Sequence, residues 1–240
     1  MADESETKDI ITNSITQDNA LIKSSFSLLL QEHRLLLAAV SKIDPTSSAW
    51  KAGRVDVEIT AGEWMSLYGD ASKAVYGTIK SAASGLYSKS VKLWSDDNSG
   101  KHIRWISGWE YNQAEGRVVL TFSGDILFEL SGFVDDFTKY QIANISGLKS
   151  THSIRLYQLA AQFKGTGWNY IKLDDLRIMF KLEGAYPRWM DLKRRVIDKA
   201  VNEINKKTDL SVSYEKIKKG RDITAIKLLI KDKEQLELGF

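Results

Sequence analysis

The sequence predicts an α+β protein built of two winged-helix domains in tandem, each a helix-turn-helix followed by a β-hairpin wing. One order of patterns (a helix, a short strand, two further helices and a two-stranded ribbon) occurs in about residues 20–122 and again in about 136–231. Such internal repetition within 240 residues favours two small domains over one large one. The second copy also carries a long amphipathic helix with one continuous cationic face.

The predicted boundaries follow changes in composition. Residues 1–18 hold five acidic residues against Lys8 and no usable periodicity, so we expect a flexible acidic tail. We expect the N-terminal winged-helix domain at 19–132, with a hinge at Ser131 and Gly132, and the C-terminal one at 133–240.

Composition also limits the class of protein. Hydrophobic residues at 43% and charged residues at 27% are typical of a soluble globular chain, and no apolar run approaches the length of a membrane helix. The acidic start lacks the layout of a signal peptide. The absence of cysteine excludes disulfides and thiol catalysis and agrees with a reducing environment, so we expect a cytoplasmic protein.

In the first copy, apolar residues at helical spacing predict one helix over about 20–40, and Thr60 and Glu63 have the spacing of a capping box. Asp70 or Ser72 is expected to cap the next helix. The remaining predicted elements are a strand at 55–59, that helix at 72–87, a three-stranded meander at 91–94, 103–106 and 118–122, and a short helix at 124–130.

In the second copy, Asp174 is expected to cap a short helix, and Gly184 and Pro187 lie between that helix and the long one. The predicted elements are short segments at 137–140 and 142–146, a helix at 150–163, a strand at 170–173, the short helix at 176–182, the long helix at 188–206, and a hairpin of 210–214 with 223–230.

The long helix carries the candidate chemistry. On a 100° wheel its apolar residues gather on one side, and that side is expected to pack on the two preceding helices. The opposite side holds Arg188, Asp191, Arg195, Asp198, Lys199, Asn202 and Lys206, with Arg194 at its edge. Residues 187–233 contain 14 Lys and Arg against 7 Asp and Glu, so the positive charge is concentrated here. Such asymmetry favours a polyanionic partner.

An outward cationic helix fits the major groove of DNA, where Arg and Lys bond guanine, Asn bonds adenine, and a carboxylate such as Asp191 or Asp198 accepts from cytosine N4. A solvated amphipathic helix explains the same pattern when it stands alone. The neighbouring hairpin favours DNA, because its tip carries Lys216, Lys218, Lys219 and Arg221, suited to phosphates or the minor groove.

The corresponding helix of the first copy presents a smaller and more weakly charged face, with Lys73, Tyr76 and Lys80 left for solvent or phosphate. Its small residues allow close approach to DNA, and they allow helix packing equally well. Among the tryptophans, Trp64, Trp94, Trp168 and Trp189 are expected in the core, whereas Trp105 and Trp109 are candidates for a dimer interface.

Motifs of catalysis do not occur in the sequence. His33, His102 and His152 are far apart and lack the spacing of a metal site, and neither a phosphate-binding Gly-x-x-x-x-Gly-Lys loop nor Gly-x-Ser-x-Gly occurs. The carboxylate pairs at 135–136 and 174–175 are explained as caps and turns. We therefore expect no enzyme, no metal site and no cofactor.

The chain resembles the Rep_3 family of plasmid replication initiators, the iteron-binding Rep proteins. The resemblance rests on the order and spacing of several stretches that together cover about 19–230. They are Asn19-Ala-Leu-Ile with Leu28-Leu-Leu-Gln-Glu-His-Arg, Arg155-Leu-Tyr-Gln-Leu, Ile171-Lys-Leu-Asp-Asp-Leu, Asp198-Lys-Ala-Val-Asn-Glu-Ile-Asn and Tyr214-Glu-Lys-Ile-Lys-Lys-Gly-Arg.

The resemblance implies two winged-helix domains that bind double-stranded DNA at directly repeated origin sites. It implies a monomer that binds iterons and helps open AT-rich DNA, a dimer that represses its own gene, and recruitment of the host initiator and replicative helicase. It assigns dimerisation and backbone contacts to the first domain, near Lys73, Tyr76 and Lys80, and base recognition to the second. The second-domain contacts would be Arg188, Arg194, Arg195, Lys199, Asn202, Lys218, Lys219 and Arg221.

Two other functions fit the same elements. A winged-helix transcriptional repressor would use identical contacts without initiating replication, and repeated sites beside the gene would distinguish the initiator. A protein-interaction scaffold would cover the cationic face with an acidic partner and would have negligible affinity for random duplex. A rolling-circle nickase is disfavoured because its histidine cluster is missing.

Overall fold

The computed structural model describes residues 10–43, 53–69, 74–94, 100–130 and 137–234. The chain divides into two compact units. Unit 1 comprises residues 1–24 and 28–146, and unit 2 comprises residues 25–27 and 147–240. The predicted domain boundary at 132/133 falls within 131–136, outside the described residues, and stays a prediction. Each unit is described by itself.

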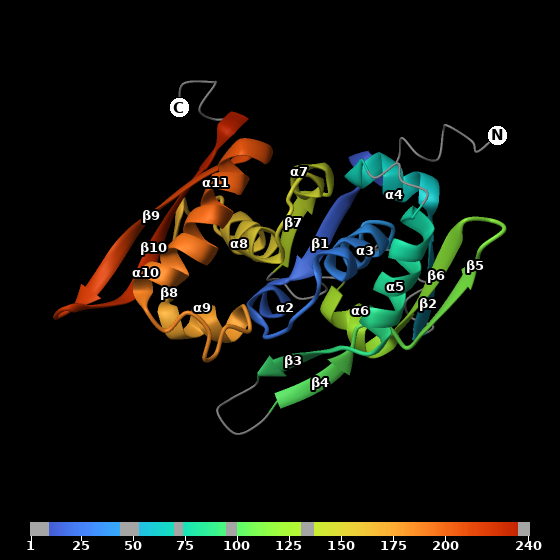
Figure 1. Ribbon diagram of the computed structural model, residues 1–240, viewed down its shortest axis with the longest axis horizontal. Helices are drawn as coiled ribbons and strands as arrows, with labels where there is room; N and C mark the ends of the chain where they lie inside the picture. Colours follow the sequence, from blue (N-terminus) through green and yellow to red (C-terminus); the bar gives the residue numbers. More distant parts are fainter. Residues whose placement is uncertain (1–9, 44–52, 70–73, 95–99, 131–136, 235–240) are drawn as a thin grey trace. The chain divides into compact units, whose positions relative to one another are not determined.

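Unit 1 is a winged helix with further strands and short helices added to it (Figure 1). Its helix-strand-helix-helix-wing series consists of α3 (Leu30–Val40), β2 (Arg54–Thr60), α4 (Ala61–Tyr68), α5 (Val75–Tyr87), β5 (Gly108–Asn112) and β6 (Arg117–Ser123). The antiparallel sheet has the order β2-β6-β5. The other elements are β1 (Ser14–Asp18), α2 (Asn19–Lys23), β3 (Ser90–Trp94), β4 (Gly100–Arg104), α6 (Gly124–Leu130), β7 (Phe137–Gln141) and α7 (Ala143–Ser146).

Unit 2 repeats the same series (Figure 1). It consists of α8 (Thr151–Gln162), β8 (Trp168–Lys172), α9 (Leu173–Met179), the continuous helical run of α10 (Trp189–Leu192), η2 (Lys193–Ile197) and α11 (Asp198–Lys207), then β9 (Leu210–Lys219) and β10 (Asp222–Asp232). The sheet order β8-β10-β9 matches β2-β6-β5, so the internal repetition corresponds to two copies of one fold.

The start of unit 1 corrects two expectations. Residues 14–18 are a strand, not part of a flexible tail: β1 pairs antiparallel with β7 from Ser14–Gln141 to Asp18–Phe137, and Ile15 is fully buried. The expected single helix over 20–40 is two helices, α2 and α3, because Ser24 and Ser25 interrupt it with side-chain hydrogen bonds. The Ser24 hydroxyl donates to the Leu21 carbonyl at 2.6 Å, and the Ser25 hydroxyl donates to the Ile178 carbonyl at 2.7 Å.

The expected meander is also wrong. Its segments form four strands in two sheets: among the described residues β3 pairs with β4 alone, whereas β6 lies between β2 and β5. The hairpin β3–β4 is thus inserted between the last helix of the series and its wing. The short helix α6 lies where the sequence predicts one, and the expected hinge at Ser131 and Gly132 lies outside the described residues.

Helix starts follow the predicted chemistry in one case and depart from it in another. Thr60 and Glu63 form the expected capping box of α4, with the Thr60 hydroxyl accepting from the Glu63 amide at 3.1 Å and the Glu63 carboxylate accepting from the Thr60 amide at 2.7 Å. Asp174 does not cap α9, which begins after Lys172 without a side-chain cap. Asp174 instead lies in the first turn, 3.7 Å from Arg177, where a carboxylate suits the helix dipole.

Candidate nucleic-acid interface

The helical run Trp189–Lys207 buries an apolar side with a repeat of four residues. Leu192, Val196, Ala200 and Ile204 are each at most 2% exposed, and α11 packs against α8 and β9. A repeat of four drifts by about 40° per step around a helix of 3.6 residues per turn. The wider π turn of η2 offsets this drift, so the stripe stays against the core.

The polar side faces outward, as the wheel predicts. Arg188, Arg194, Arg195, Lys199, Asn202 and Lys206 are all exposed, and we call them the cationic face. Arg194 and Arg195 both lie in the π turn. Arg194 is 72% exposed and lies 3.7 Å from Asp191, and the Arg195 guanidinium is 5.9 Å from the centre of the Tyr186 ring. Such exposed pairs are weak, so both guanidinium groups remain available to a ligand.

Asp198, one of the two carboxylates expected to contact bases, already has partners within the protein. Asp198 accepts a hydrogen bond of 2.7 Å from the Tyr214 hydroxyl and a charged one of 2.6 Å from Lys193. Burial raises the pKa of the Asp198 carboxyl, but these bonds outweigh it and hold the pKa below its usual range. Asp198 therefore joins the helix to strand β9.

The wing is the β9–β10 hairpin, which extends beyond α10 in Figure 1. It turns at Gly220, whose φ of +65° favours glycine. Lys216, Lys218, Lys219 and Arg221 are all exposed, as expected for a phosphate-binding wing tip. Buried and exposed residues alternate near the base of β9, and the residues toward its tip are mostly exposed. The outer part of the hairpin therefore does not pack against the hydrophobic core.

In unit 1 the expected site is smaller. Lys73 lies outside the described residues, and Tyr76 and Lys80 on α5 are half-buried. The Lys80 ammonium lies 3.9 Å from the centre of the Tyr111 ring, and the Tyr76 and Tyr111 rings are 6.4 Å apart. Burial, with a smaller effect from Tyr111, raises the pKa of the Tyr76 hydroxyl. Tyr76 and Lys80 therefore contact Tyr111 on the wing strand β5 and are only partly exposed.

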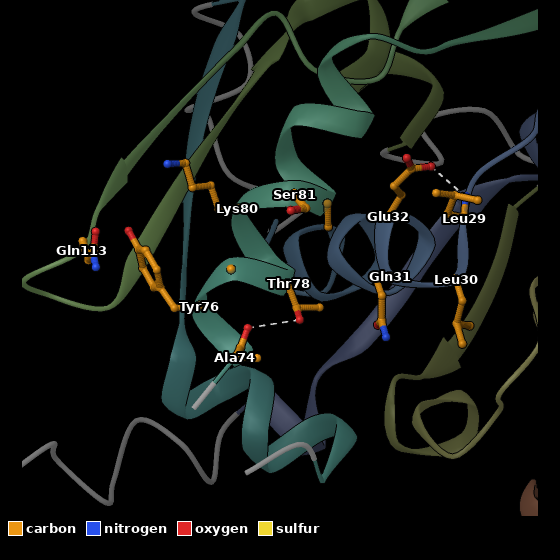
Figure 2. Close-up of a pocket in the computed structure, with 12 residues that line it drawn as sticks. Leu29, Leu30, Gln31, Glu32, Ala74, Tyr76, Thr78, Lys80, Ser81 and Gln113 are labelled. Atoms are coloured by element: carbon orange, nitrogen blue, oxygen red, sulfur yellow. Dashed lines mark hydrogen bonds between the residues drawn. The ribbon is translucent and has the colours of Figure 1, made fainter. Parts of the chain in front are cut away.

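Figure 2 shows a groove beside them. Its volume is about 850 Å³, and the start of α3 (Leu29–Glu32), one face of α5 (Ala74–Ala82) and Gln113 line it. Tyr76 and Lys80 point from α5 toward the turn that carries Gln113. The Glu32 carboxylate at its edge accepts from the Leu29 amide at 2.7 Å and from Lys89 at 2.5 Å. The groove is a mainly apolar surface with one cation.

The aromatic residues separate into core and surface differently from the prediction. Trp64 is fully buried as expected, but Trp168 is 46% exposed, with Lys227 lying 5.1 Å from its ring centre. Trp105 is 1% exposed and belongs to the core, so it is not available to a dimer. Met190, near the start of the helical run, is 66% exposed, although the wheel places it at the edge of the apolar side.

In residues 10–234, outside the undescribed gaps, no three His, Asp or Glu side chains gather as a metal site would require. Over those same ranges, none of the helices has the length and apolarity to span a membrane.

Comparison with known proteins gives a family match for two successive parts of the chain. Residues 14–161 match the family described as Initiator Replication protein, WH1, and residues 172–230 match Initiator Rep protein, WH2. An Escherichia coli protein named Replication initiation protein is 22% identical over 229 residues, covering 92% of this chain and 70% of the relative. The PI protein of Escherichia coli is 27% identical over 251 aligned residues, covering 89% and 81%.

A solved structure agrees with the fold. The crystal structure of Pi initiator protein in complex with iteron DNA superposes with a TM-score of 0.80 at 23% identity, covering 92% of this chain and 97% of that one. At this identity the likeness supports the tandem winged-helix fold. Because the two family matches together span most of the sequence, the chain belongs to the Rep_3 family of plasmid replication initiators.

Proposed function

We propose that this chain is a sequence-specific double-stranded DNA-binding protein that initiates plasmid replication at directly repeated origin sites, the iterons. The observation that carries the proposal is the exposure of the whole cationic face beside an exposed cationic wing, on a helix whose other side is buried. The solved relative is in complex with iteron DNA, which supports the same ligand here.

In this proposal the helix of unit 2 enters a major groove and reads bases. Arg188, Arg194, Arg195, Lys199 and Asn202 provide those contacts, and Lys216, Lys218, Lys219 and Arg221 bind phosphates or the minor groove. Helix α5 of unit 1 contributes Tyr76 and Lys80, and the undescribed Lys73 is proposed with them. Two helices in successive major grooves would protect a site of about two turns, with their centres roughly 34 Å apart.

The steps after binding are also proposals. The bound chain helps to open adjacent AT-rich DNA and recruits the host replication initiator and the replicative helicase, while a dimer represses the chain's own gene. This places it in the bacterial cytoplasm on its plasmid. Family membership and the replication initiation protein among its relatives support this sequence of events.

The test compares two variants that lose the same charge. Arg194→Ala with Arg195→Ala removes two members of the cationic face, whereas Arg54→Ala with Lys101→Ala removes two exposed cations from unit 1 strands. Gel retardation uses the full chain and the DNA upstream of its coding region. We expect the first variant to lose specific retardation and the second to keep it. Equal retardation by both variants would refute the proposal that the helical run Trp189–Lys207 contacts DNA.

A replication assay separates the initiator from the repressor. A plasmid carrying the repeated sites but no initiator gene is introduced with the chain supplied in trans. Maintenance of that plasmid supports initiation. Specific binding that represses the upstream promoter without maintaining the plasmid would identify the chain as a transcriptional repressor. A lack of affinity for any DNA duplex would favour the protein-interaction scaffold.

A further inference from the structure

The recognition helix begins with an apolar side chain that packing does not explain. Met190 is 66% exposed in the first turn of α10, between the exposed residues Arg188 and Arg194. Together with Trp189 and Asp191 these residues line a concavity of about 430 Å³. Leu192, two residues later, is fully buried instead, and the half-buried Trp189 ring lies edge-on to the Tyr214 ring. Met190 therefore stands on the outer surface among cations.

Met190 lies in the first turn of the helix, where its exposed side chain could contact bases. Helix-turn-helix proteins contact base edges with the N-terminal residues of the recognition helix. In the major groove, thymine is the base that presents an apolar group, its C5-methyl, and an apolar side chain distinguishes it there. A methionine side chain is flexible and polarizable, so it fits an irregular apolar surface. It has no hydrogen-bond donor with which to read a guanine or a phosphate.

We infer that Met190 is a specificity-determining residue that contacts the C5-methyl of a thymine in the bound site. The inference rests on the proposed function, since it needs this helix in the major groove. Arg188 and Arg194 on either side supply hydrogen bonds to neighbouring bases or phosphates, and Met190 adds the one contact that hydrogen bonding does not provide. The site is thus expected to hold a thymine whose methyl group matters.

The size of the effect follows from the area involved. Removing one methyl group from a buried contact costs about fourfold in affinity, equivalent to about 0.8 kcal/mol where 1.4 kcal/mol is tenfold. Loss of the Met190 side chain removes the same contact from the protein side. The two losses are therefore expected to be non-additive, which an effect on folding or on net charge would not produce.

The experiment uses the DNA duplex that the wild type binds specifically in gel retardation. Each thymidine of this duplex is replaced, one at a time, by deoxyuridine, which lacks only the C5-methyl group. Equilibrium binding is measured with the full chain, with Met190→Ala and with Met190→Leu. For the wild type we expect one deoxyuridine to weaken binding about fourfold. Met190→Ala should bind the natural duplex about fourfold more weakly and be indifferent to that substitution, and Met190→Leu should keep the wild-type profile.

Met65→Ala is the matched control, because Met65 is 38% exposed on α4 of unit 1. It should reproduce the wild-type deoxyuridine profile. The inference is overturned if Met190→Ala keeps every deoxyuridine penalty of the wild type, or if no deoxyuridine weakens the wild type. Failure of the wild type to select any duplex would instead remove the proposed function, and the inference with it.

Discussion

The Tyr214 hydroxyl on strand β9 donates a hydrogen bond of 2.7 Å to the Asp198 carboxylate at the start of α11. The same carboxylate accepts from Lys193 of the π turn at 2.6 Å, and the Trp189 ring meets the Tyr214 ring edge-on with centres 6.3 Å apart. Asp198 therefore joins the helical run to strand β9 of the wing, together with the two hydrogen bonds between the Asn205 side chain and the Val212 backbone.

Loss of the Tyr214 hydroxyl should loosen this junction. We expect Tyr214→Phe to lower the free energy of unfolding by about 0.5–1.5 kcal/mol, the usual net value of one hydrogen bond. Urea denaturation measures it. Tyr170→Phe is the control, because Tyr170 is 47% exposed on β8 and its change should stay within about 0.5 kcal/mol. Equal midpoints for both variants would show that the bond adds nothing.

The Asp198 carboxylate also predicts a pH dependence. Its pKa is lowered in the folded chain, so its interactions add stability above the unfolded pKa of about 3.9, and this stability is lost as the pH falls through the folded value. The difference in stability between the wild type and Asp198→Asn should be constant from about pH 7 to 5 and shrink below about pH 4. A difference that grows in acid would contradict the sign.

Two glycines of α5 should respond oppositely to alanine. A Cβ at Gly85 would overlap Glu32 Oε1 and lie 2.8 Å from Glu32 Cδ, and this carboxylate is held by Leu29 and Lys89. Gly77 has open space around it. We expect Gly77→Ala to stabilise unit 1 by about 0.5–1 kcal/mol and Gly85→Ala to destabilise it. Thermal denaturation of both variants checks the pair, and a stabilising Gly85→Ala would show that Glu32 moves without cost.

The buried side of the helical run Trp189–Lys207 should contribute more to the free energy of unfolding than the exposed side. Ile204 is fully buried, so Ile204→Ala is expected to cost about 2–5 kcal/mol. Asn202, two residues earlier on the exposed side, should tolerate alanine within about 0.5 kcal/mol while binding DNA more weakly. Chemical denaturation and DNA binding of both variants separate the two sides. A large stability loss for Asn202→Ala would mean that the sides are assigned wrongly.

The wing lysines should act through phosphates. Lys218→Ala with Lys219→Ala is expected to weaken binding similarly on specific and random duplexes and to reduce the slope of log K against log salt by about 1.8, at about 0.9 per phosphate contact. Titration over a range of salt concentrations measures the slope. An unchanged slope would show that these two ammonium groups do not neutralise phosphate.

Local patterns in the sequence predicted the repeated unit well. The helix periodicity of residues 188–206, the alternation in 55–59 and the Thr60–Glu63 capping box are properties of neighbouring residues, so each could be identified without the fold. The order of elements then predicted the tandem winged helix.

Long-range pairings could not be predicted in the same way. Strand β1 is polar apart from Ile15, and it becomes a strand because β7, more than a hundred residues later, supplies its hydrogen bonds. The separation of the meander into two sheets likewise depends on β2 pairing with β6. The sequence predicts Trp168 in the core, but this side chain lies on the exposed face of β8 and is 46% exposed. The candidate site was easier to predict, because the helical period of residues 188–206 shows which of its side chains are exposed.

Dimethyl sulfate protection of guanine N7, an atom of the major groove, tests the central claim most directly. Bound wild-type chain should protect guanines in its specific site, and Arg194→Ala with Arg195→Ala, which is expected to lose specific retardation, should leave those guanines open to methylation at the same protein concentration. Guanines that the double variant still protects in full would contradict the placement of this helix in the groove.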